Sequence, residues 1–491
     1  MKKAIVTGGA GFIGSHIVDA LLARGFKVTV IDDLSTSTME FVNPKVDFIK
    51  MNINSPRIGA VIKKIKPNYI FHLAAQIDVR VSMKDPFHDA NVNAMGTLRL
   101  LEAAREIGIE KFIYSSSGGA IMSRAKVIPT PEKHWTRPLS PYGVSKLSAE
   151  NYIDCYGKLY GFKTVLLRYS NVYGPRQGQK GEAGVVAVFI NQILNGVQPT
   201  IFGDGKQTRD FVYVGDVVNA NMLAMKSGVE GVFNISTKKE TDVNSLLKII
   251  SKAIHFNLLP KRVKAIKEER RSSLDNSLAK KELGWEPEVS LNEGVGKTVQ
   301  AFQIRKAVKH LKNGGLVIYP TETAYALGAD ACNTRAVRKI FKYKKRSFAK
   351  TLPLIAGDLA SVIKVANFSK KAKEIAGKYW PAPLTLQLFV KANSKLSKEV
   401  ILQKTIAVRV SSNEIAQGIA LKLGNPIVST SANISGKEAC YSVADIKKQF
   451  KNKIPEDILI IDTGVLSKKK PSTIVSVGKK IKVLRQGEVR L

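Results

Sequence analysis

The stretch KKAIVTGGAGFIGSHIVDALLARGFKVTVIDD, residues 2–33, decides the fold of the first half of the chain. It reads as a short apolar strand, a glycine-rich turn, an amphipathic helix and a second strand that ends on an acid. Gly8, Gly11 and Gly14 suit a tight turn whose backbone approaches a pyrophosphate at a helix N-terminus. Asp32 closes the second strand, where a carboxylate accepts hydrogen bonds from ribose hydroxyls and repels a 2′-phosphate. The pattern predicts a doubly wound α/β domain that binds NAD rather than NADP.

Length and composition limit the class of protein. A chain of 491 residues is too long for one core and indicates two or three domains. No apolar run approaches the roughly 18 residues of a membrane span, and the glycine turn follows Met1 too closely for a signal peptide. The three cysteines show no CxxC or CxH spacing, which indicates neither a disulfide framework nor a zinc site. We therefore expect a cytoplasmic protein with no membrane segment and no resident metal.

The net charge of +37 is high and unevenly spread. From residue 301 onward there are 36 Lys and Arg against 12 Asp and Glu, whereas the first 300 residues carry 41 against 28. A solvated, lysine-rich surface is one explanation. Contact with polyanions such as tRNA, nucleotides or pyrophosphate is the other.

The segment SPYGVSK, residues 140–146, places Tyr142 and Lys146 four positions apart on one helical face. An ammonium beside a phenol, together with the positive ring of NAD, lowers the tyrosine pKa and makes the phenol a general base. The alternative is a surface Tyr/Lys pair. The dinucleotide pattern and the strand FIYSSSGG, residues 112–119, favour the catalytic interpretation.

Further motifs extend this pattern over about 300 residues. They come in the order TGGAGFIG (7–14), HLAAQ (72–76), VNAMGT (92–97), YGVSK (142–146), RYSNVYGP (168–175), FGDGKQTRDFVYVGDVV (202–218) and LGWEP (283–287). In this order the first half resembles the extended short-chain dehydrogenase/reductase family, in its NAD-dependent sugar-nucleotide epimerase/dehydratase branch, and in particular the UDP-glucose 4-epimerase-like members.

The resemblance implies a Rossmann sheet with a small substrate-binding subdomain, bound NAD, and a homodimer formed through this domain. It implies that Ser117 shares a sugar hydroxyl with Tyr142, and that Ser272 gates the space beside the sugar's C2 group. The residues that it places along the cofactor or the nucleotide diphosphate are Gly8, Gly11, Phe12, Ile13, Gly14, Asp32, Ala74, Ala75 and Lys146 for NAD, and Asn171 and Arg209 for the diphosphate.

The expected reaction is C4 epimerisation of UDP-glucose or UDP-N-acetylglucosamine. Dehydratases of this branch carry an Asp-Glu pair just after the active-site Ser or Thr, whereas here Gly118, Gly119 and Ala120 follow Ser117. A sugar oxidised at C4 can then only be reduced again, from the other face after it turns, and NAD is regenerated. The alternatives are another sugar-nucleotide-modifying member of the family and an NAD-binding regulatory domain.

The second half carries a different set of motifs. These are GLVIYPTETAYALGADA (315–331), KYKKRSFAKTLPL (342–354), WPAPLTLQL (380–388), TIAVRV (405–410), STSANISG (429–436), PSTIVSV (471–477) and VLRQG (483–487). They resemble the YrdC-like family, the threonylcarbamoyl-AMP synthases of tRNA modification, over the whole 190 residues. The resemblance implies a second, YrdC-like α/β domain with a twisted sheet.

The residue types of the second half suit an adenylate-forming site. Lys344 and Arg346 alternate, so both reach phosphate if the segment is extended, and Ser431 and Asn433 offer a hydroxyl and an amide from one small-residue loop. By resemblance these four surround ATP and the carbamate. By the same resemblance Thr321 contacts threonine, and the nucleotide contacts are Thr385, Arg409 and Ser472.

The implied chemistry is positioning. Threonine's amine captures bicarbonate or CO2, and the carbamate attacks the α-phosphorus of ATP and releases pyrophosphate, with Mg2+ bridging the phosphates. The product, L-threonylcarbamoyladenylate, serves t6A37 formation in tRNA, and this short form depends on other proteins of that pathway for the final transfer. The alternative is a double-stranded RNA-binding module without synthase activity.

The two resemblances meet in GKTVQAFQIRKAVKHLKNGG, residues 296–315. The first family closes with a helix and the second opens with one, and no Gly/Ser/Pro linker separates them. We therefore expect one domain at 1–302 and a second at 303–491. Periodicity leaves open whether the two helices merge or break.

Overall fold

The structure is a computed structural model that describes residues 1–178, 184–226, 228–255, 259–265, 269–349, 351–478 and 480–491. The chain divides into two compact units, Met1–Val299 and Gln300–Leu491. No helix among these described residues is long and apolar enough to cross a membrane.

Unit 1 is built on a seven-stranded sheet in the order β10-β6-β5-β4-β1-β2-β3, in which all neighbours are parallel. Strands such as β1 and β4 are buried along nearly their whole length, which requires cover on both faces of the sheet. The strands are β1 (Lys3–Thr7), β2 (Lys27–Asp32), β3 (Asp47–Lys50), β4 (Tyr69–His72), β5 (Lys111–Ser117), β6 (Lys163–Tyr169) and β10 (Gly231–Ile235).

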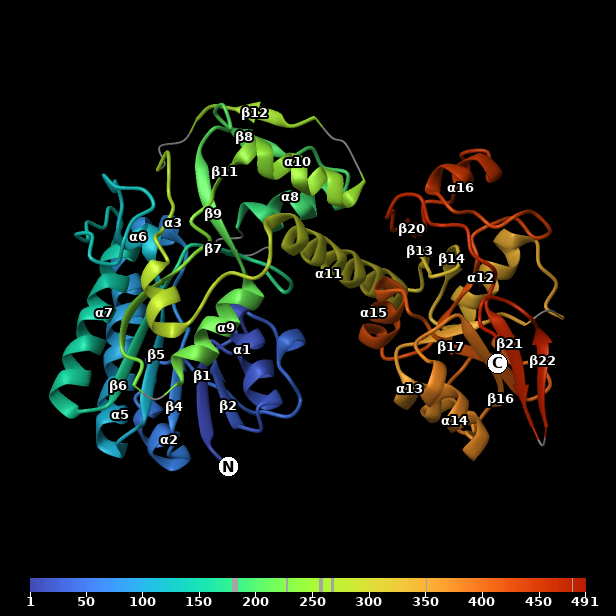
Figure 1. Ribbon diagram of the computed structural model, residues 1–491, viewed down its shortest axis with the longest axis horizontal. Helices are drawn as coiled ribbons and strands as arrows, with labels where there is room; N and C mark the ends of the chain where they lie inside the picture. The colour runs from blue at the N-terminus through green and yellow to red at the C-terminus, as the bar shows by residue number, and fades with distance from the viewer. Residues whose placement is uncertain (179–183, 227, 256–258, 266–268, 350, 479) are drawn as a thin grey trace. The chain divides into compact units, whose positions relative to one another are not determined.

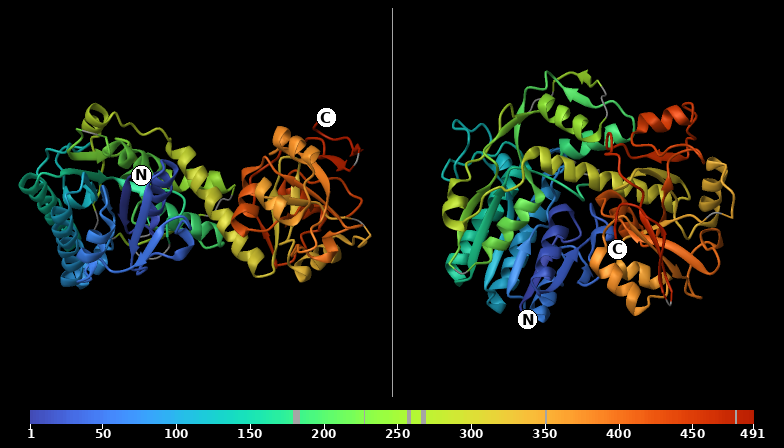
Figure 2. Two further views of the ribbon diagram at one scale, coloured as in Figure 1. Left: turned by 90° about the horizontal axis from the view of Figure 1, so that it is seen from below. Right: turned by 45° about the vertical axis from the view of Figure 1, so that its right-hand side comes forward.

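Helices cover both faces of this sheet (Figures 1 and 2). On one face α1 (Phe12–Ala23) and α9 (Val214–Ala224) share an apolar cluster with the strands. On the other face the cluster includes α2 (Ile58–Ile65), α5 (Gly96–Ile107) and α7 (Pro141–Tyr160). The predicted doubly wound parallel sheet is confirmed.

A smaller group of elements accompanies the sheet. Its three-stranded sheet has the order β11-β9-β7, and β8 pairs with β12. The bounds are β7 (Asn171–Tyr173), β8 (Thr200–Phe202), β9 (Thr208–Tyr213), β11 (Glu240–Asp242), β12 (Lys261–Val263), α8 (Val185–Leu194) and α10 (Val243–Ile254). The remaining short helices of unit 1 are η1 (Met39–Phe41), α3 (Val79–Lys84), α4 (Pro86–Ala90), the π-helix η2 (Asn91–Met95), α6 (Gly118–Ile121) and the π-helix η3 (Ala279–Leu283).

The LGWEP motif fastens the end of unit 1. The Trp285 side chain is fully buried, and its indole nitrogen donates to the Asp216 carbonyl at 2.8 Å. The Asp216 carboxylate accepts from the amides of Glu288 and Val289 at 3.2 and 3.3 Å. The motif therefore holds the segment after η3 against the start of α9.

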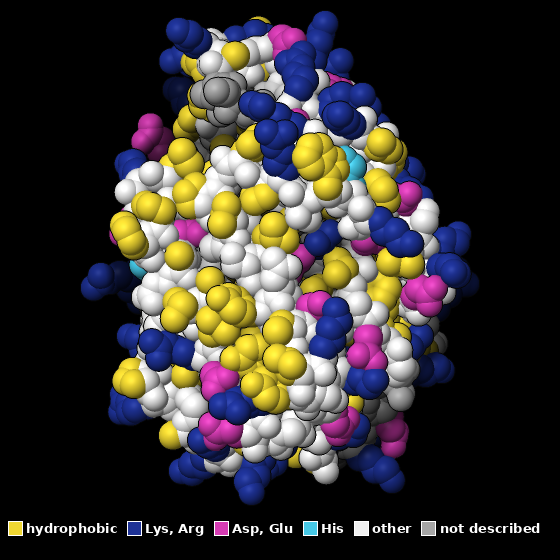
Figure 3. Space-filling view, turned by 90° about the vertical axis from the view of Figure 1, so that its left-hand side faces the viewer, with side chains coloured by type: hydrophobic (Ala, Val, Ile, Leu, Met, Phe, Trp, Pro, Cys, Tyr) yellow, Lys and Arg dark blue, Asp and Glu magenta, His cyan; other side chains and the backbone are white. Residues whose placement is uncertain are grey.

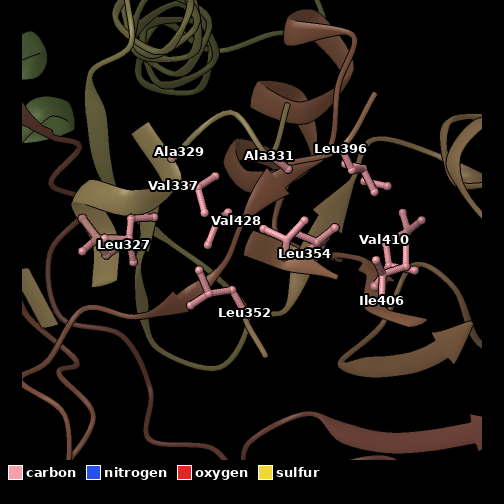
Figure 4. Close-up of a cluster of buried hydrophobic side chains, with 14 of the residues drawn as sticks. Leu327, Ala329, Ala331, Val337, Leu352, Leu354, Leu396, Ile406, Val410 and Val428 are labelled. Atoms are coloured by element: carbon pink, nitrogen blue, oxygen red, sulfur yellow. The ribbon is translucent and has the colours of Figure 1, made fainter. Parts of the chain in front are cut away.

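Unit 2 is an α/β body with two mixed sheets, in the orders β19-β14-β13-β20 and β18-β15-β17-β16-β21-β22. Its strands are β13 (Leu316–Pro320), β14 (Tyr325–Gly328), β15 (Leu354–Ala356), β16 (Leu384–Phe389), β17 (Thr405–Val410), β18 (Ile427–Val428), β19 (Thr430–Ser431), β20 (Ile458–Ile460), β21 (Thr473–Val477) and β22 (Ile481–Arg485). Its helices are α12 (Thr334–Lys344), α13 (Leu359–Val365), α14 (Lys370–Tyr379), η4 (Lys398–Val400), α15 (Glu414–Leu423) and α16 (Val443–Gln449). Side chains of both sheets and of α12 meet in one apolar core, part of which is drawn in Figure 4.

The stretch that sequence periodicity left open forms a single helix, α11 (Leu291–Lys312). Its first residues belong to unit 1, where Val295 and Val299 are buried, and its last turns belong to unit 2, where Ala307, Val308 and Leu311 join an apolar cluster. The two predicted helices have therefore merged.

Candidate active sites

The glycine turn connects β1 to α1 in unit 1. Gly8 has φ +69°, and its amide donates to the Ile31 carbonyl at 2.9 Å. A Cβ on Gly14 would overlap the carbonyl oxygen of Gly8, so the helix packs directly on the turn. Gly11 caps α1 without a side-chain hydrogen bond, and no acid lies in the first turn, which begins with Phe12. This helix N-terminus suits an anionic ligand.

Asp32 ends β2 beside that turn. Its carboxylate accepts from the amides of Ala10 at 3.0 Å and Leu34 at 2.9 Å, and from the Ser37 hydroxyl at 2.7 Å. These bonds fix the carboxylate at the carboxyl edge of the sheet. A cradle that glycine Cβ atoms would fill, next to a fixed acid, is compatible with a dinucleotide such as NAD.

The loop after β4 lies directly against the glycine turn. The Ala74 amide donates to the Thr7 hydroxyl at 3.2 Å, and a Cβ on Gly8 would lie 2.7 Å from the Ala74 nitrogen. His72 sits between Thr7 and Thr97, with its ring nitrogens 2.8 and 2.9 Å from their hydroxyls. Burial, with a smaller contribution from the Lys146 charge, lowers the pKa of His72 to about 3, so this histidine is neutral.

Tyr142 and Lys146 lie on the buried side of α7. The helix begins at Pro141 with the Ser140 hydroxyl as its cap, and the Lys146 ammonium donates to the Ser115 carbonyl of β5 at 2.7 Å. It also lies 4.2 Å from the centre of the Tyr114 ring. Burial lowers the pKa of Lys146 to about 7, against the opposing charges of Glu150 and Asp89.

Ser117 ends β5, next to the start of α7. Gly143 approaches so closely that a Cβ there would overlap the carbonyl oxygen of Ala120, three residues after Ser117. The structure therefore packs the segment of Ser117 against the turn that carries Tyr142. The neighbouring Ser116 hydroxyl is buried and has no hydrogen-bond partner among the described residues.

The residues expected at the sugar nucleotide come from β7, β9 and the segment after β12. Asn171 pairs with Phe211 across the parallel strands β7 and β9, two residues from Arg209, whose guanidinium donates to the Thr208 carbonyl at 2.8 Å. The Ser272 hydroxyl lies 3.4 Å from the position that a Cβ on Gly119 would occupy. Ser272 is thus brought beside the loop that follows Ser117.

Two buried groups of unit 1 escaped the sequence reasoning. Arg168 of β6 and Glu150 of α7 form an ion pair at 2.6 Å that is almost fully buried. The Asp210 carboxylate accepts from Thr237, Lys238 and Ser273, and so ties β9 to the segment of Ser272. Arg168 lies in the motif RYSNVYGP and Asp210 in the motif FGDGKQTRDFVYVGDVV, but their partners are between 18 and 63 positions away.

In unit 2, Lys344 joins the two ends of its predicted site. Its buried ammonium donates to the carbonyls of Ser431 and Asn433, the latter at 2.7 Å, and to Asn433 Oδ1 at 3.0 Å. The Ser431 hydroxyl also donates to Asn433 Oδ1, at 2.6 Å. Burial and the charge of Arg346 lower the pKa of Lys344 to about 8.

Lys344 and Arg346 do not lie in an extended segment, which was the condition on which their alternation would bring both to phosphate. Lys344 is the last residue of α12, and Lys345 ends that helix in the left-handed conformation at φ +50°. Arg346 follows, and its guanidinium donates to the Thr351 carbonyl at 2.8 Å. Its Nε is buried and has no hydrogen-bond partner in the described part of the chain. A helix end thus sets the spacing of the two cations.

The Pro-Thr-Glu-Thr turn after β13 places Thr321 and Glu322. The Thr321 hydroxyl donates to the Ala324 carbonyl at 2.6 Å. Glu322 reaches β17, where it accepts from Arg409 Nε at 2.9 Å and from the Ser411 hydroxyl. Sequence reasoning did not find Glu322, although it lies next to Thr321.

Thr385 and Ser472 meet at the start of β21. The Thr385 hydroxyl of β16 donates to the Ser472 hydroxyl at 3.0 Å. Arg485 of β22 donates to the Ser472 carbonyl at 2.7 Å and to its hydroxyl at 3.0 Å. Burial, and then the charge of Arg409, lower the pKa of Arg485. The two guanidinium groups therefore repel each other electrostatically. The VLRQG motif contains Arg485 and was the available signal for it.

Comparison with known proteins finds a family match for each half of the chain. Residues 4–236 match the model of the "NAD dependent epimerase/dehydratase family". A UDP-glucose 4-epimerase of Mycolicibacterium smegmatis is 42% identical over 308 residues, which cover 61% of this chain and 98% of that protein. The chain belongs to the NAD dependent epimerase/dehydratase family.

Solved structures of this family resemble unit 1. A UDP-glucose 4-epimerase of Thermotoga maritima with UDP-glucose matches with a TM-score of 0.60 and 46% identity, over 62% of this chain and 99% of that chain. A UDP-N-acetylglucosamine 4-epimerase of Methanobrevibacter ruminantium M1 with UDP-N-acetylmuramic acid matches with a TM-score of 0.58 and 36% identity, over 61% and 98%.

The C-terminal part of this family member is a Sua5/YrdC domain. Residues 309–487 match the Sua5/YciO/YrdC model, whose description reads "Telomere recombination". Within the described residues, no group of three or more His, Cys, Asp or Glu side chains is placed to hold a metal ion.

Proposed function

We propose that the chain is a bifunctional enzyme, a UDP-sugar 4-epimerase joined to an L-threonylcarbamoyladenylate synthase, with domain limits at 1–302 and 303–491. For the epimerase, the observation that carries the proposal is the packing of the Ser117 segment against the helix of Tyr142 and Lys146, at the sheet edge that bears the glycine turn. The family to which the chain belongs supports it.

In this proposal Tyr142 is the general base and acid at the sugar's C4 hydroxyl. The Lys146 ammonium favours the phenolate, and the Ser117 hydroxyl holds the same sugar hydroxyl. NAD, when bound, oxidises and re-reduces the sugar at C4. The glycine turn with Gly8, Gly11, Phe12, Ile13 and Gly14 would hold its pyrophosphate, Asp32 its ribose, and Ala74 and Ala75 would line it. Because Gly118, Gly119 and Ala120 offer no acid or base, the site is suited to epimerisation and not to dehydration.

The substrate residues of the epimerase have separate tasks. Asn171 and Arg209 bind the diphosphate of the UDP-sugar, as a neutral donor and a cation suit. Ser272 borders the sugar beside Gly119 and leaves room for an acetamido group at C2. We therefore propose UDP-glucose and UDP-N-acetylglucosamine as substrates.

In the second domain we propose that Lys344, Arg346, Ser431 and Asn433 surround the phosphates of ATP and the carbamate. Thr321 contacts threonine, and the nucleotide contacts are Thr385, Arg409 and Ser472. The buried Nε of Arg346, left without a partner among the described residues, supports a role in anion binding. ATP enters as its Mg2+ complex together with threonine and bicarbonate, and the product passes to tRNA through other proteins of the t6A pathway.

Three free cysteines support a reducing, cytoplasmic location.

We further propose that the epimerase domain forms a homodimer through α3, α4 and α7. The helices α3 and α4 pack on α7, and apolar side chains gather on the face of unit 1 seen in Figure 3. The exposed apolar residues of these helices are Val81, Met83, Phe87, Val144, Tyr152, Leu159 and Tyr160. A two-fold contact would cover the same patch on both copies. Light scattering of wild type and Phe87→Glu tests it, since the charge would leave a monomer.

The two activities are tested on the purified whole chain. One assay supplies NAD and a panel of UDP-hexoses and follows the C4 epimers by chromatography. The other supplies threonine, bicarbonate and Mg-ATP, and follows pyrophosphate release that requires all three. A double-stranded RNA-binding module would release none, and a regulatory NAD-binding domain would convert no sugar.

A further inference from the structure

A buried carboxylate outside both predicted residue sets lies behind the candidate epimerase site. Asp89 of α4 is fully buried. It accepts from three neutral donors, which are the Ser145 hydroxyl at 2.5 Å, Gln76 Nε2 at 2.7 Å and Asn93 Nδ2 at 3.2 Å. A buried carboxylate is costly without a cation, so a purely structural position would suit Asn as well.

These donors come from three elements, namely the loop after β4, η2 and α7. Gln76 belongs to the loop of Ala74 and Ala75, and Asn93 of the π-helix η2 clamps that loop. The Gln76 amide donates to Asn93 Oδ1 at 2.9 Å, and Asn93 Nδ2 donates to the Gln76 carbonyl at 3.0 Å. π-Helices are frequent at functional sites. Ser145, directly before Lys146 on α7, accepts from Asn93 Nδ2 at 3.1 Å.

Asp89 is also placed to act on Lys146 by its charge. The groups around the Lys146 ammonium are Tyr114 of β5, His72 of β4 and Asp89 of α4, with Tyr142 and Glu150 on its own helix. Glu150 is compensated by Arg168, and His72 is neutral. Asp89 is bonded to neutral donors, and of the two carboxylates it is therefore the one without a cationic partner among the described residues. The charge of Glu150, and to a smaller extent that of Asp89, raises the pKa of Lys146 against the effect of burial.

We propose that Asp89 is a positioning residue of the epimerase site, which links the cofactor loop to α7 through Gln76, Asn93 and Ser145 and supplies the fixed negative charge that favours the Lys146 ammonium. This rests on the proposed epimerase function. Loss of the charge should let Lys146 deprotonate at lower pH, whereas loss of one hydrogen bond should loosen α7 without that effect.

Three variants of the whole chain separate these contributions. Asp89→Asn keeps the shape and removes the charge, Ser145→Ala keeps the charge and removes one hydrogen bond, and Asp216→Asn removes a buried carboxylate elsewhere in unit 1. For each we would measure kcat against pH, the NAD content, and amide hydrogen exchange of residues 73–78 and 141–150 without substrate.

We expect Asp89→Asn and Ser145→Ala to raise exchange in both segments several-fold, and only Asp89→Asn to move the alkaline limb of kcat to lower pH, by roughly one unit. Asp216→Asn should do neither. The proposal would be overturned if the alkaline limb of kcat stayed in place in Asp89→Asn, or if it moved equally in Asp216→Asn. Unchanged hydrogen exchange in both Asp89→Asn and Ser145→Ala would also overturn it. A wild type that epimerises no UDP-hexose would contradict the proposed function instead, because the exchange measurement needs no sugar.

Discussion

Glu322 and Arg409 form an ion pair in unit 2 that is buried on both sides, with side-chain exposures of 8% and 5% and an Oε1–Nε distance of 2.9 Å. It joins the turn after β13 to β17, and so connects the two sheets of the unit. Thr321, the proposed threonine contact, precedes Glu322, while Arg409 is a proposed nucleotide contact. The pair therefore links the two proposed substrate positions.

Removing Glu322 should be strongly destabilising for unit 2. Glu322→Ala leaves the Arg409 guanidinium buried and uncompensated, which typically costs about 3–5 kcal/mol. Glu322→Gln keeps a hydrogen-bond acceptor and should cost less. Hydrogen exchange against denaturant concentration resolves the free energy of unfolding of each unit within the whole chain. A loss below about 1 kcal/mol in unit 2, as at an ordinary surface position, would contradict this account.

Tyr142→Phe should abolish epimerisation while NAD remains bound. The phenol transfers the proton, whereas the glycine turn and Asp32 hold the cofactor, so the rate should fall by at least the ~100-fold that loss of a general base costs. NAD content is measured after acid release from the purified protein. Undiminished turnover in the variant would rule out this role.

Ser272→Tyr should change which sugars the first domain accepts. The Ser272 hydroxyl lies beside Gly119, and a phenol ring there would fill the space of an acetamido group. Wild type should epimerise UDP-N-acetylglucosamine alongside UDP-glucose, and the variant should keep UDP-glucose alone. Initial rates on the two sugars give the ratio. The idea fails if wild type rejects the acetamido sugar or if tyrosine leaves the ratio unchanged.

ATP binding by the second domain should weaken as pH rises through the pKa of Lys344. That pKa is about 8, lowered by burial and by Arg346, so the ammonium is charged below this value and neutral above it. Affinity should then fall towards ~10-fold per pH unit on the alkaline side, as linkage to one proton requires. Lys344→Arg keeps its charge at all these pH values and serves as the control. Calorimetric titration with Mg-ATP that shows parallel pH curves for both proteins would exclude Lys344 as the titrating contact.

Much of unit 1 could be predicted from local pattern. Residues 2–33 determine a strand, turn, helix and strand by short-range periodicity and glycine spacing, and the structure has all four. Asp89 and Asp210 could not be found in this way, because what distinguishes them is burial among partners from other elements. Asp210 lies in a motif that is visible in the sequence and Asp89 lies between two motifs, but the three-dimensional bonds that explain both residues are not visible there.

The second half shows a similar limit. Lys344 and Arg346 were identified as a pair on the condition of an extended segment, whereas α12 ends at Lys344. A helix end and a strand give similar spacing for two residues, and only the packing of Ile340 and Phe341 in the core decides between them. Glu322 and Arg485 were missed because their partners, Arg409 and Ser472, are 87 and 13 residues away.

The most direct test of two independent activities in one chain is a cross-assay of four proteins. These are wild type, Tyr142→Phe in the first site, and Lys344→Ala and Arg346→Ala in the second. Each is assayed for UDP-sugar epimerisation and for threonine-dependent pyrophosphate release from ATP. We predict that Tyr142→Phe loses only the first activity, and that Lys344→Ala and Arg346→Ala lose only the second. A wild-type protein that lacks one of the two activities would contradict the account. So would a second-site variant that also lowers the epimerase rate.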